Sequence, residues 1–165
     1  MKKIIVIENI LHKSERVDLI NKSKKMLIDG EELRKKYSLL FYPGKQTDPN
    51  LHLLEEFKIF HKKILRKIKE KSDLDFQIKK SWVNFSNGSD VCWHDHNCNY
   101  ALVYYAKTIP FINNGTIFKD NIKVNVKQNS ILLFPGSLVH SAPKFKIPFD
   151  RYTLAMELDF FRSYK

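Results

Sequence analysis

The sequence predicts a single α+β domain in which N-terminal helices pack on a double-stranded β-helix, the jelly-roll or cupin-like barrel. Two observations predict this class. Residues 1–78 are mainly helical in pattern, with apolar residues recurring at helical spacing. Residues 79–165 instead hold short segments rich in β-branched and aromatic residues, separated by turn signals. The first part is therefore expected to support a barrel core built by the second, all within one domain spanning residues 1–165.

Length and composition agree with one globular domain. The 165 residues suffice for a substantial core, and 43% hydrophobic with 28% charged residues excludes a disordered or fibrous chain. No apolar run approaches the length of a membrane span, and the short apolar opening ends at Glu8 without a cleavage signal. We therefore expect a cytoplasmic protein. Cys92 and Cys98 are too few for a disulfide framework and are expected to be reduced thiols, although a bridge between them is an alternative.

The formal net charge of +11 is high for this length. It is compatible with an acidic substrate, a nucleic acid or another polyanion. The basic residues are scattered, however, and no arginine-rich cluster alternates with aromatic residues. The abundance of Lys, Ile and Asn also fits the codon usage of an A/T-rich genome. Nucleic-acid binding is therefore an alternative that the sequence does not favour.

The helical part begins with an expected strand at residues 2–7. Ser14 is the expected N-cap of a first helix that ends near Gly30. The clearest helix is expected to open at Asp48-Pro49, because proline favours the first helical position. A turn is expected between these helices at Tyr42-Pro43-Gly44. Three histidines of this part, His12, His52 and His61, are expected to be surface or flanking residues.

The strand-rich part shows alternation and β-branched residues between turn signals. A hairpin is expected at Asn113-Asn114-Gly115, joining residues 110–112 to 116–118. The expected strands are residues 81–85, 91–96, 100–106, 110–112, 116–118, 122–126, 131–134, 138–141 and 151–158.

Three of the six histidines are arranged as metal ligands would be. His94 and His96 are two residues apart in an expected strand, so both imidazoles face one side while Asp95 faces the other. His140 comes from a distant expected strand and is placed to close the site. Imidazole nitrogens are good ligands for Fe(II), Zn(II) and Mn(II). A lone histidine would be read as a core or surface residue, but this pattern indicates a metal site.

Several segments together resemble the 2-oxoglutarate- and Fe(II)-dependent oxygenases, notably the small prolyl-hydroxylase-like proteins of bacteria and phages. The similarity runs over most of the chain, and its specific motifs lie within about residues 82–157. This resemblance is also compatible with a protein encoded by a phage. The residues that carry it are Ile7-Glu8-Asn9-Ile10-Leu11, Trp82-Val83-Asn84-Phe85, the turn at Gly88, Trp93-His94-Asp95-His96, Tyr104-Tyr105, Leu133-Phe134-Pro135-Gly136-Ser137-Leu138-Val139-His140 and Arg151-Tyr152-Thr153.

The resemblance implies a function and a set of cofactors. The expected activity is a dioxygenase that couples the oxidative decarboxylation of 2-oxoglutarate to the hydroxylation of a substrate, with Fe(II) and 2-oxoglutarate as cofactors. His94 and His140 would be the first and the distal metal ligand. Arg151 and Thr153 match the Arg-x-Ser/Thr pair that binds the far carboxylate of 2-oxoglutarate, and a guanidinium suits a carboxylate by paired charge-assisted hydrogen bonds.

Further residues are expected to line the cofactor pocket. These are Asn84 and Tyr104, with Trp82 and Phe134 as additional candidates. Aromatic residues at strand spacing are more often core residues, so the aromatic members of this set have a structural alternative.

The chain departs from the family pattern at position 96, where a carboxylate is usual. His96 as a third imidazole ligand is the favoured interpretation. Asp95 is the alternative, if a bulge turns it toward the metal. Asp90, from the preceding turn, is a third candidate.

Other classes of function stay open from the sequence. One is a three-histidine cupin-type metalloenzyme that does not use 2-oxoglutarate, and another is a non-catalytic basic β-barrel binding module. A zinc site of His94, His96 and Cys98 is disfavoured, because three alternate residues of one strand span too far to chelate one ion. The substrate is undetermined: a protein side chain, a small molecule and a nucleobase all remain, and the oligomeric state is unknown.

Overall fold

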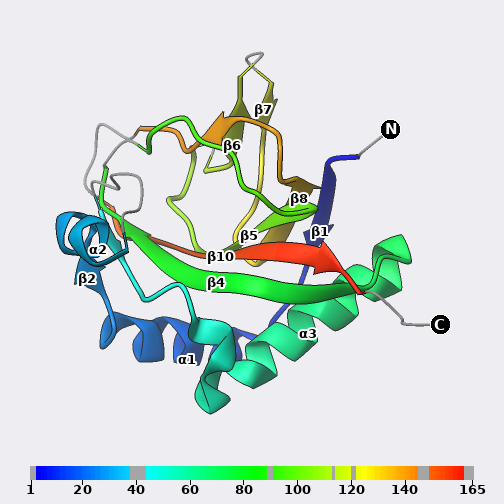
Figure 1. Ribbon diagram of the computed structural model, residues 1–165, viewed down its shortest axis with the longest axis horizontal. Coiled ribbons are helices and arrows are strands. Elements are labelled where there is room, and N and C mark those ends of the chain that lie inside the picture. The colour runs from blue at the N-terminus through cyan, green and yellow to red at the C-terminus, as the bar shows by residue number, and fades with distance from the viewer. Residues whose placement is uncertain are drawn as a thin grey trace.

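The computed structural model describes residues 3–37, 44–88, 91–112, 114–119, 122–144 and 149–161. Within these residues the chain has an α+β fold with a mostly antiparallel β-sheet and three α-helices, as Figure 1 shows. The expected α+β class is thereby confirmed, and the sheet arrangement is consistent with a jelly roll.

A seven-stranded antiparallel sheet forms the centre of the molecule. Its strand order is β1-β8-β5-β10-β4-β3-β2, so the first part of the chain contributes the strands at both edges. The two long strands β10 and β4 pair along their whole length, with β5 on the other side of β10. The strands of this sheet are β1 (Ile5–Glu8), β2 (Ile28–Asp29), β3 (Lys45–Gln46), β4 (Phe76–Ser86), β5 (Tyr100–Lys107), β8 (Ser130–Pro135) and β10 (Arg151–Phe160).

A second, three-stranded sheet has the order β7-β6-β9. It consists of β6 (Thr116–Phe118), β7 (Lys123–Val124) and β9 (His140–Ser141). In Figure 1 this small sheet lies above the large sheet, on the side opposite the two longer helices.

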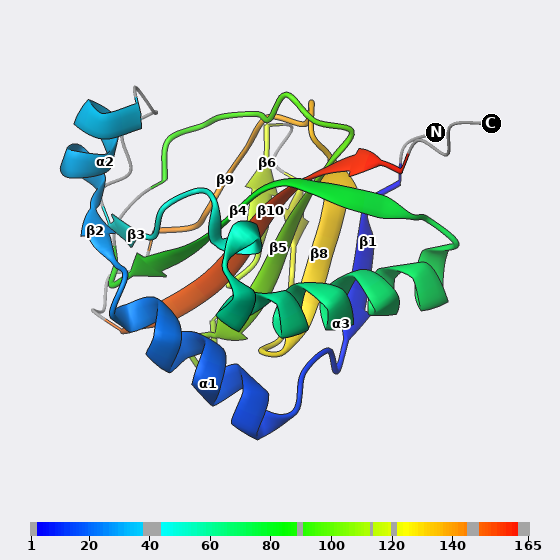
Figure 2. The same ribbon diagram turned by 60° about the horizontal axis from the view of Figure 1, so that its bottom comes forward.

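The helices are α1 (Lys13–Lys24), α2 (Gly30–Tyr37) and α3 (Glu55–Ser72), with a short 3-10 helix η1 (Leu51–Leu53) before α3. Figure 2 shows α1 and α3 lying across one face of the large sheet. The apolar stripe predicted for the third helix is buried there: Phe57, Phe60, Ile64 and Ile68. None of the described helices has the length and apolar character that crossing a bilayer requires.

Strand alternation divides the interior into two apolar clusters. On the helix side, Tyr104 of β5 and Leu154 of β10 belong to the main core. On the other side, Tyr105 and Phe134 pack in a smaller cluster beneath the three-stranded sheet. Because successive residues of a strand point to opposite faces, β5 and β8 contribute to both clusters.

Both helix starts differ from the expectation. The first helix begins at Lys13 with His12 as its N-cap, two residues before Ser14. The backbone N–H of His12 donates to the Glu15 carboxylate at 2.9 Å and so closes the first turn. Asp48 does not cap α3. Its side chain accepts a hydrogen bond from the Asn50 backbone N–H at 2.9 Å, so it stabilises the turn before η1.

His61 is a clear correction to the surface assignment. It lies on the buried face of α3 and only 4% of it is exposed. Burial lowers its pKa from 6.5 to about 4, an effect that nearby His52 reinforces and that the Phe57 carbonyl opposes. The helix position alone could not reveal this, because His61 occurs beside Phe60 at the border of the apolar stripe.

Two expected strands are absent from the described residues. Residues 91–96 form a strand-like segment with one isolated bridge, at His94, and residues 110–112 form a turn. Of the expected strand 138–141, His140 and Ser141 are the strand residues. The described thiols of Cys92 and Cys98 are both free, as expected. The turn residues Tyr42 and Pro43, the hairpin residue Asn113 and the candidate ligand Asp90 lie outside the described residues.

Candidate metal centre

A backbone bridge places two of the candidate ligands opposite each other. The His94 backbone N–H donates to the His140 carbonyl at 3.0 Å, and the His140 N–H donates back to the His94 carbonyl at 2.8 Å. Directly opposed residues of an antiparallel pair extend their side chains to the same side. The two imidazoles are therefore neighbours although 46 residues separate them, from 94 to 140 in the chain.

Gly136 holds the segment that carries His96. The His96 backbone N–H donates to the Gly136 carbonyl at 2.9 Å, and the Gly136 N–H donates to the Asn99 carbonyl at 3.2 Å. A Cβ at position 136 would lie 2.4 Å from the Cys98 carbonyl oxygen and 2.8 Å from that of His96. Only glycine therefore permits residues 96–98 to approach the chain this closely at position 136, directly after β8.

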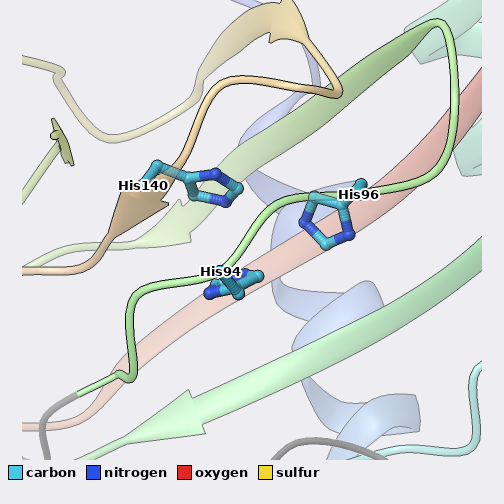
Figure 3. Close-up of side chains that lie close together, drawn as sticks. All are labelled: His94, His96 and His140. Atoms are coloured by element: carbon cyan, nitrogen blue, oxygen red, sulfur yellow. The ribbon is translucent and has the colours of Figure 1, made fainter.

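The three histidines converge on one point, as Figure 3 shows. Their candidate ligand atoms all lie within 4.8 Å of one another. The ring centroids of His94 and His140 are 4.4 Å apart, and that of His96 lies 5.0 Å from His94 and 5.2 Å from His140. Segments distant in sequence thus bring three imidazoles to one face, as the alternation of residues 94 and 96 predicts.

Backbone carbonyls fix the tautomer of two of these rings. The Nδ1 atom of His94 lies 2.7 Å from the Cys92 carbonyl oxygen, and Nδ1 of His140 lies 2.8 Å from the Leu138 carbonyl oxygen. A carbonyl oxygen only accepts, so Nδ1 must carry the proton in each ring. In the neutral form, Nε2 then keeps its lone pair for a metal ion.

The third ring has a different partner. Nδ1 of His96 lies 3.1 Å from Oε1 of Glu157, a buried carboxylate of β10. Burial raises the pKa of Glu157, but the hydrogen bond to His96 and the charge of Lys80 outweigh it, and the net effect is a lowered pKa. A carboxylate partner also selects the Nδ1-protonated tautomer, so all three rings present Nε2 as the unprotonated atom.

Burial keeps two of the imidazoles neutral. It lowers the pKa of His140 to about 3, with a further decrease from neighbouring His94. It likewise lowers the pKa of His94, whose contact with the Cys92 carbonyl opposes the shift. Neutral imidazoles are the form that binds metal ions.

The alternative ligands that the structure describes, Asp95 and Cys98, do not join this cluster. Asp95 lines the same pocket, but it is exposed and is not among the grouped ligand atoms. The thiol of Cys98 points elsewhere, since it donates to the Tyr100 carbonyl at 3.1 Å, and burial raises its pKa to about 11. A zinc site of His94, His96 and Cys98 therefore has no support in this geometry.

The cluster opens into a pocket of about 260 Å³ between the two sheets. Arg151, Thr153 and Asn84, which the sequence predicts as cofactor-binding residues, line the same pocket as the histidines. Arg151 is 4% exposed, its guanidinium donates to the Asn114 carbonyl at 2.8 Å, and it lies over the Tyr105 ring at 5.4 Å. The structure therefore holds a cation in the wall of the metal pocket.

Polar residues beside Arg151 form a connected row. The Asn84 amide donates to the Thr153 hydroxyl at 3.5 Å, and the Gln46 amide donates to the Asn84 side-chain oxygen at 2.7 Å. Gln46 comes from the short strand β3, which lies between β2 and β4 and pairs with β4 at Asn84. No feature of the sequence around Gln46 could have predicted this contact.

Tyr104 does not line this pocket, which corrects the expectation. It belongs to the helix-side core, where its hydroxyl donates to Asn129 at 2.9 Å and burial raises its pKa. The next residue, Tyr105, faces the other way, and its hydroxyl lies 2.9 Å from that of Thr116. The tyrosine pair was recognisable from the sequence, but the choice between its members depends on strand register.

Glu157 is a site residue that the sequence analysis missed. It follows Arg151, Thr153 and Ala155 at alternate positions of β10, and all four line the pocket. The same alternation that placed Thr153 beside Arg151 could have indicated Glu157.

The donor set fits a divalent first-row transition metal. Three neutral imidazoles with their second nitrogens already engaged are good ligands for such an ion. The aromatic surroundings agree: the ring centroid of Phe134 lies 4.7 Å from that of His140, and Trp82 lies 5.8 Å from His96. A partly dry wall of this kind limits the access of water to a bound ion.

Solved structures with the same fold exist at low sequence identity. HygX from Streptomyces hygroscopicus, in a structure with nickel, 2-oxoglutarate and hygromycin B bound, matches with a TM-score of 0.70 and 10% identity over 95% of this chain and 82% of that chain. The viral collagen prolyl hydroxylase vCPH from Paramecium Bursaria Chlorella virus-1 matches with a TM-score of 0.62 and 16% identity over 96% and 90%.

A third structure, the non-heme alpha ketoglutarate dependent epimerase SnoN from nogalamycin biosynthesis, has a TM-score of 0.68 and 10% identity over 95% of this chain and 76% of that chain. No protein-family model matches the sequence, and no curated protein matches it in sequence. At these identities the similarity shows that the fold is shared.

Proposed function

We propose that the protein is a non-haem Fe(II) oxygenase that couples the oxidative decarboxylation of 2-oxoglutarate to the hydroxylation of a substrate. One observation carries the proposal: three imidazoles with ligand atoms within 4.8 Å of one another share a pocket with the buried Arg151. A metal ligand set beside a carboxylate-binding cation is what this co-substrate requires. HygX and SnoN, which share the fold, are described with 2-oxoglutarate or as dependent on it.

His94, His96 and His140 would hold the Fe(II) through their Nε2 atoms. Three ligands leave other coordination positions open for the co-substrate and O₂. The bound iron supplies the redox chemistry by which 2-oxoglutarate, O₂ and a substrate R–H become succinate, CO₂ and R–OH. His96 then occupies the position of the family's usual carboxylate, in preference to the exposed Asp95.

Arg151 would bind the far carboxylate of 2-oxoglutarate. A guanidinium in a low-dielectric wall binds a carboxylate strongly and in a fixed orientation. Thr153, two residues along the same face of β10, offers a hydroxyl to the same group. Ala155 follows at the next alternate position and lines the same pocket.

The pocket also limits what can react. Its volume of about 260 Å³ is just below the usual range of about 300–1,000 Å³ for ligand sites. It therefore suits a co-substrate of a few carbon atoms together with one end of a substrate, which would displace water from the reacting centre.

The two facing sheets are proposed to be the two layers of a double-stranded β-helix.

The substrate class is not fixed by the fold. HygX is described with hygromycin B and vCPH as a collagen prolyl hydroxylase, so closely related folds accept very different molecules. A protein side chain, a small molecule and a nucleobase all remain within the proposal.

The all-imidazole ligand set favours one alternative, a three-histidine metalloenzyme that does not use 2-oxoglutarate. Arg151 discriminates between the two. We expect iron-loaded wild-type protein to release CO₂ from carboxyl-labelled 2-oxoglutarate in an O₂-dependent manner, even without substrate. Arg151→Ala should lose this release at low 2-oxoglutarate concentration while keeping its iron. Wild-type protein that retains iron but releases no CO₂ would contradict the proposal and favour the alternative.

A further inference from the structure

We propose that Glu157 is the anionic partner of the metal site: it accepts the Nδ1–H hydrogen bond of His96 and supplies, through that imidazole, the negative charge that an all-histidine ligand set lacks. The inference rests on the proposed function, since it assumes that the three histidines hold a metal ion. It makes Glu157 a positioning residue, which acts on the metal through His96.

The contact distinguishes His96 from the other two ligands. Nδ1 of His94 and Nδ1 of His140 face neutral backbone carbonyls, whereas Nδ1 of His96 faces a carboxylate at 3.1 Å. Glu157 is 8% exposed, so solvent screens this interaction weakly. Its second oxygen lies 3.9 Å from the ammonium group of Lys80.

The strand position makes the carboxylate rigid. Glu157 belongs to β10, which lies between β4 and β5, and its register partners are Lys80 and Ala101. The register of β10 against β4 shifts directly after Glu157, at Leu158. Residues on central strands hold their geometry better than residues on loops, and a fixed partner fixes the orientation of the imidazole that it contacts.

The chemistry follows from charge. A divalent ion with two imidazoles and one carboxylate has a net charge of +1, whereas three neutral imidazoles leave +2. A carboxylate hydrogen-bonded to Nδ1 draws the proton toward itself and makes Nε2 a stronger donor. His96, at the position where the resembling family has its acid, is therefore the one ligand that takes on anionic character. In this arrangement a carboxylate still contributes its negative charge to the site, but it acts through the imidazole of His96 instead of binding the metal directly.

The test measures the affinity for Co(II), an air-stable probe, by competition with a chelating dye. Glu157→Gln keeps an acceptor oxygen but removes the charge, and we expect about 10-fold weaker binding, with up to about 100-fold for Glu157→Ala. Glu70→Gln is the matched control, because it removes one carboxylate charge from the exposed face of α3. It should bind Co(II) as the wild type does. Binding by Glu157→Gln and Glu157→Ala within twofold of wild type would overturn the proposal.

A double-mutant cycle separates this role from a purely structural one. In a His96→Asp background the metal would have its own carboxylate and Nδ1 of residue 96 would no longer exist. Glu157→Gln should then leave Co(II) affinity unchanged or improve it, because two nearby carboxylates repel. An equal loss in both backgrounds would overturn the proposal by showing that Glu157 supports the fold only.

The two proposals fail separately. Wild-type protein that binds Co(II) but releases no CO₂ from 2-oxoglutarate would contradict the proposed function and leave the role of Glu157 intact.

Nuclear magnetic resonance of the imidazole nitrogens in metal-free protein gives a direct readout of the His96 tautomer. We expect His96 to be protonated at Nδ1 in the wild type and to become a mixture of tautomers in Glu157→Ala. If the His96 tautomer were unchanged in that variant, Glu157 would not be the group that determines it, which would contradict the proposal.

Discussion

The two faces of the seven-stranded sheet differ sharply although the same strands build both. The face covered by α1 and α3 is apolar, with Tyr104, Leu154 and Met156 in its core. The opposite face carries two buried charged groups, Arg151 and Glu157, and lines the pocket that the three histidines share. Along most of β10 the residues of both faces are buried, so on this strand the difference lies in chemistry and not in exposure.

Neighbouring residues of one strand show what this division means. Arg151 and Tyr152 are adjacent and both buried, yet Arg151 lines the pocket and Tyr152 packs on Phe85 in the helix-side core at 5.0 Å between ring centroids. We therefore expect the helix-side face to govern the stability of the fold and the pocket face to govern ligand binding under the proposed function. Substitutions on the two faces should affect different measurements.

The largest difference is expected between His94→Ala and Leu154→Ala. Removing one of three ligands should lower the proposed activity by a factor of at least about 10³, equivalent to about 4 kcal/mol, with little change in the melting temperature of the metal-free protein. Leu154→Ala creates a cavity in a fully buried position and should reduce the free energy of unfolding by about 3 kcal/mol. Its activity per folded molecule should stay normal. Loss of metal-free stability in His94→Ala would weaken the division between the faces.

A second pair tests adjacent residues. Arg151→Ala should weaken 2-oxoglutarate binding about 100-fold, since two charge-assisted hydrogen bonds are lost. Tyr152→Ala should destabilise the fold and leave the affinity for 2-oxoglutarate within about threefold of wild type. Isothermal titration calorimetry on metal-loaded, anaerobic protein measures both. Equal losses of affinity would show that the two faces are not independent.

The helix face should respond to pH through His61. Its pKa is about 4 in the folded protein and 6.5 ordinarily. Below pH 6.5 the unfolded chain takes up a proton that the folded chain refuses, so stability falls as the pH decreases from 6.5 to 4. At pH 5 the loss is about 2 kcal/mol relative to neutral pH. In urea unfolding, the free energy of unfolding of His61→Leu should depend less on pH than that of the wild type. An unchanged pH dependence would contradict the lowered pKa assigned to buried His61.

The smallest expected effects concern the two tyrosines. Tyr104→Phe removes a hydrogen bond to Asn129 and should cost about 1 kcal/mol of stability, with no change in 2-oxoglutarate affinity. Tyr105→Phe removes a contact with Thr116 beneath Arg151, and should weaken 2-oxoglutarate binding a few-fold. Thermal unfolding measures the loss of stability and calorimetry the loss of affinity. Weaker 2-oxoglutarate binding in Tyr104→Phe but not in Tyr105→Phe would contradict the placement of Tyr105 beside Arg151.

The sequence predicts the parts of this molecule that depend on local periodicity. The α+β class, the apolar stripe of α3 and the facing of His94 and His96 all follow from spacing within one segment. The bridge that joins His94 to His140 could not be derived from spacing, because it depends on a pairing between distant segments. The resemblance implies that His140 is the distal ligand, but it does not predict the backbone bridge.

Register explains what the sequence missed. The contact of Tyr105 instead of Tyr104 with Arg151, and the place of Glu157 in the pocket wall, depend on which face of its strand each residue occupies. Gln46 and the need for glycine at position 136 arise where segments far apart in the chain touch. The buried position of His61 likewise depends on how α3 meets the sheet, which helical periodicity alone does not fix at the edge of the apolar stripe.

An anaerobic titration of Fe(II)-loaded protein with 2-oxoglutarate tests the central claim most directly, because chelation of Fe(II) by this co-substrate produces a weak visible absorption band. The three-histidine site with Arg151 predicts a saturable band at one equivalent, which is absent in His94→Ala and shifted to about 100-fold higher 2-oxoglutarate concentration in Arg151→Ala. Wild-type protein that holds iron but develops no band at saturating 2-oxoglutarate would contradict it.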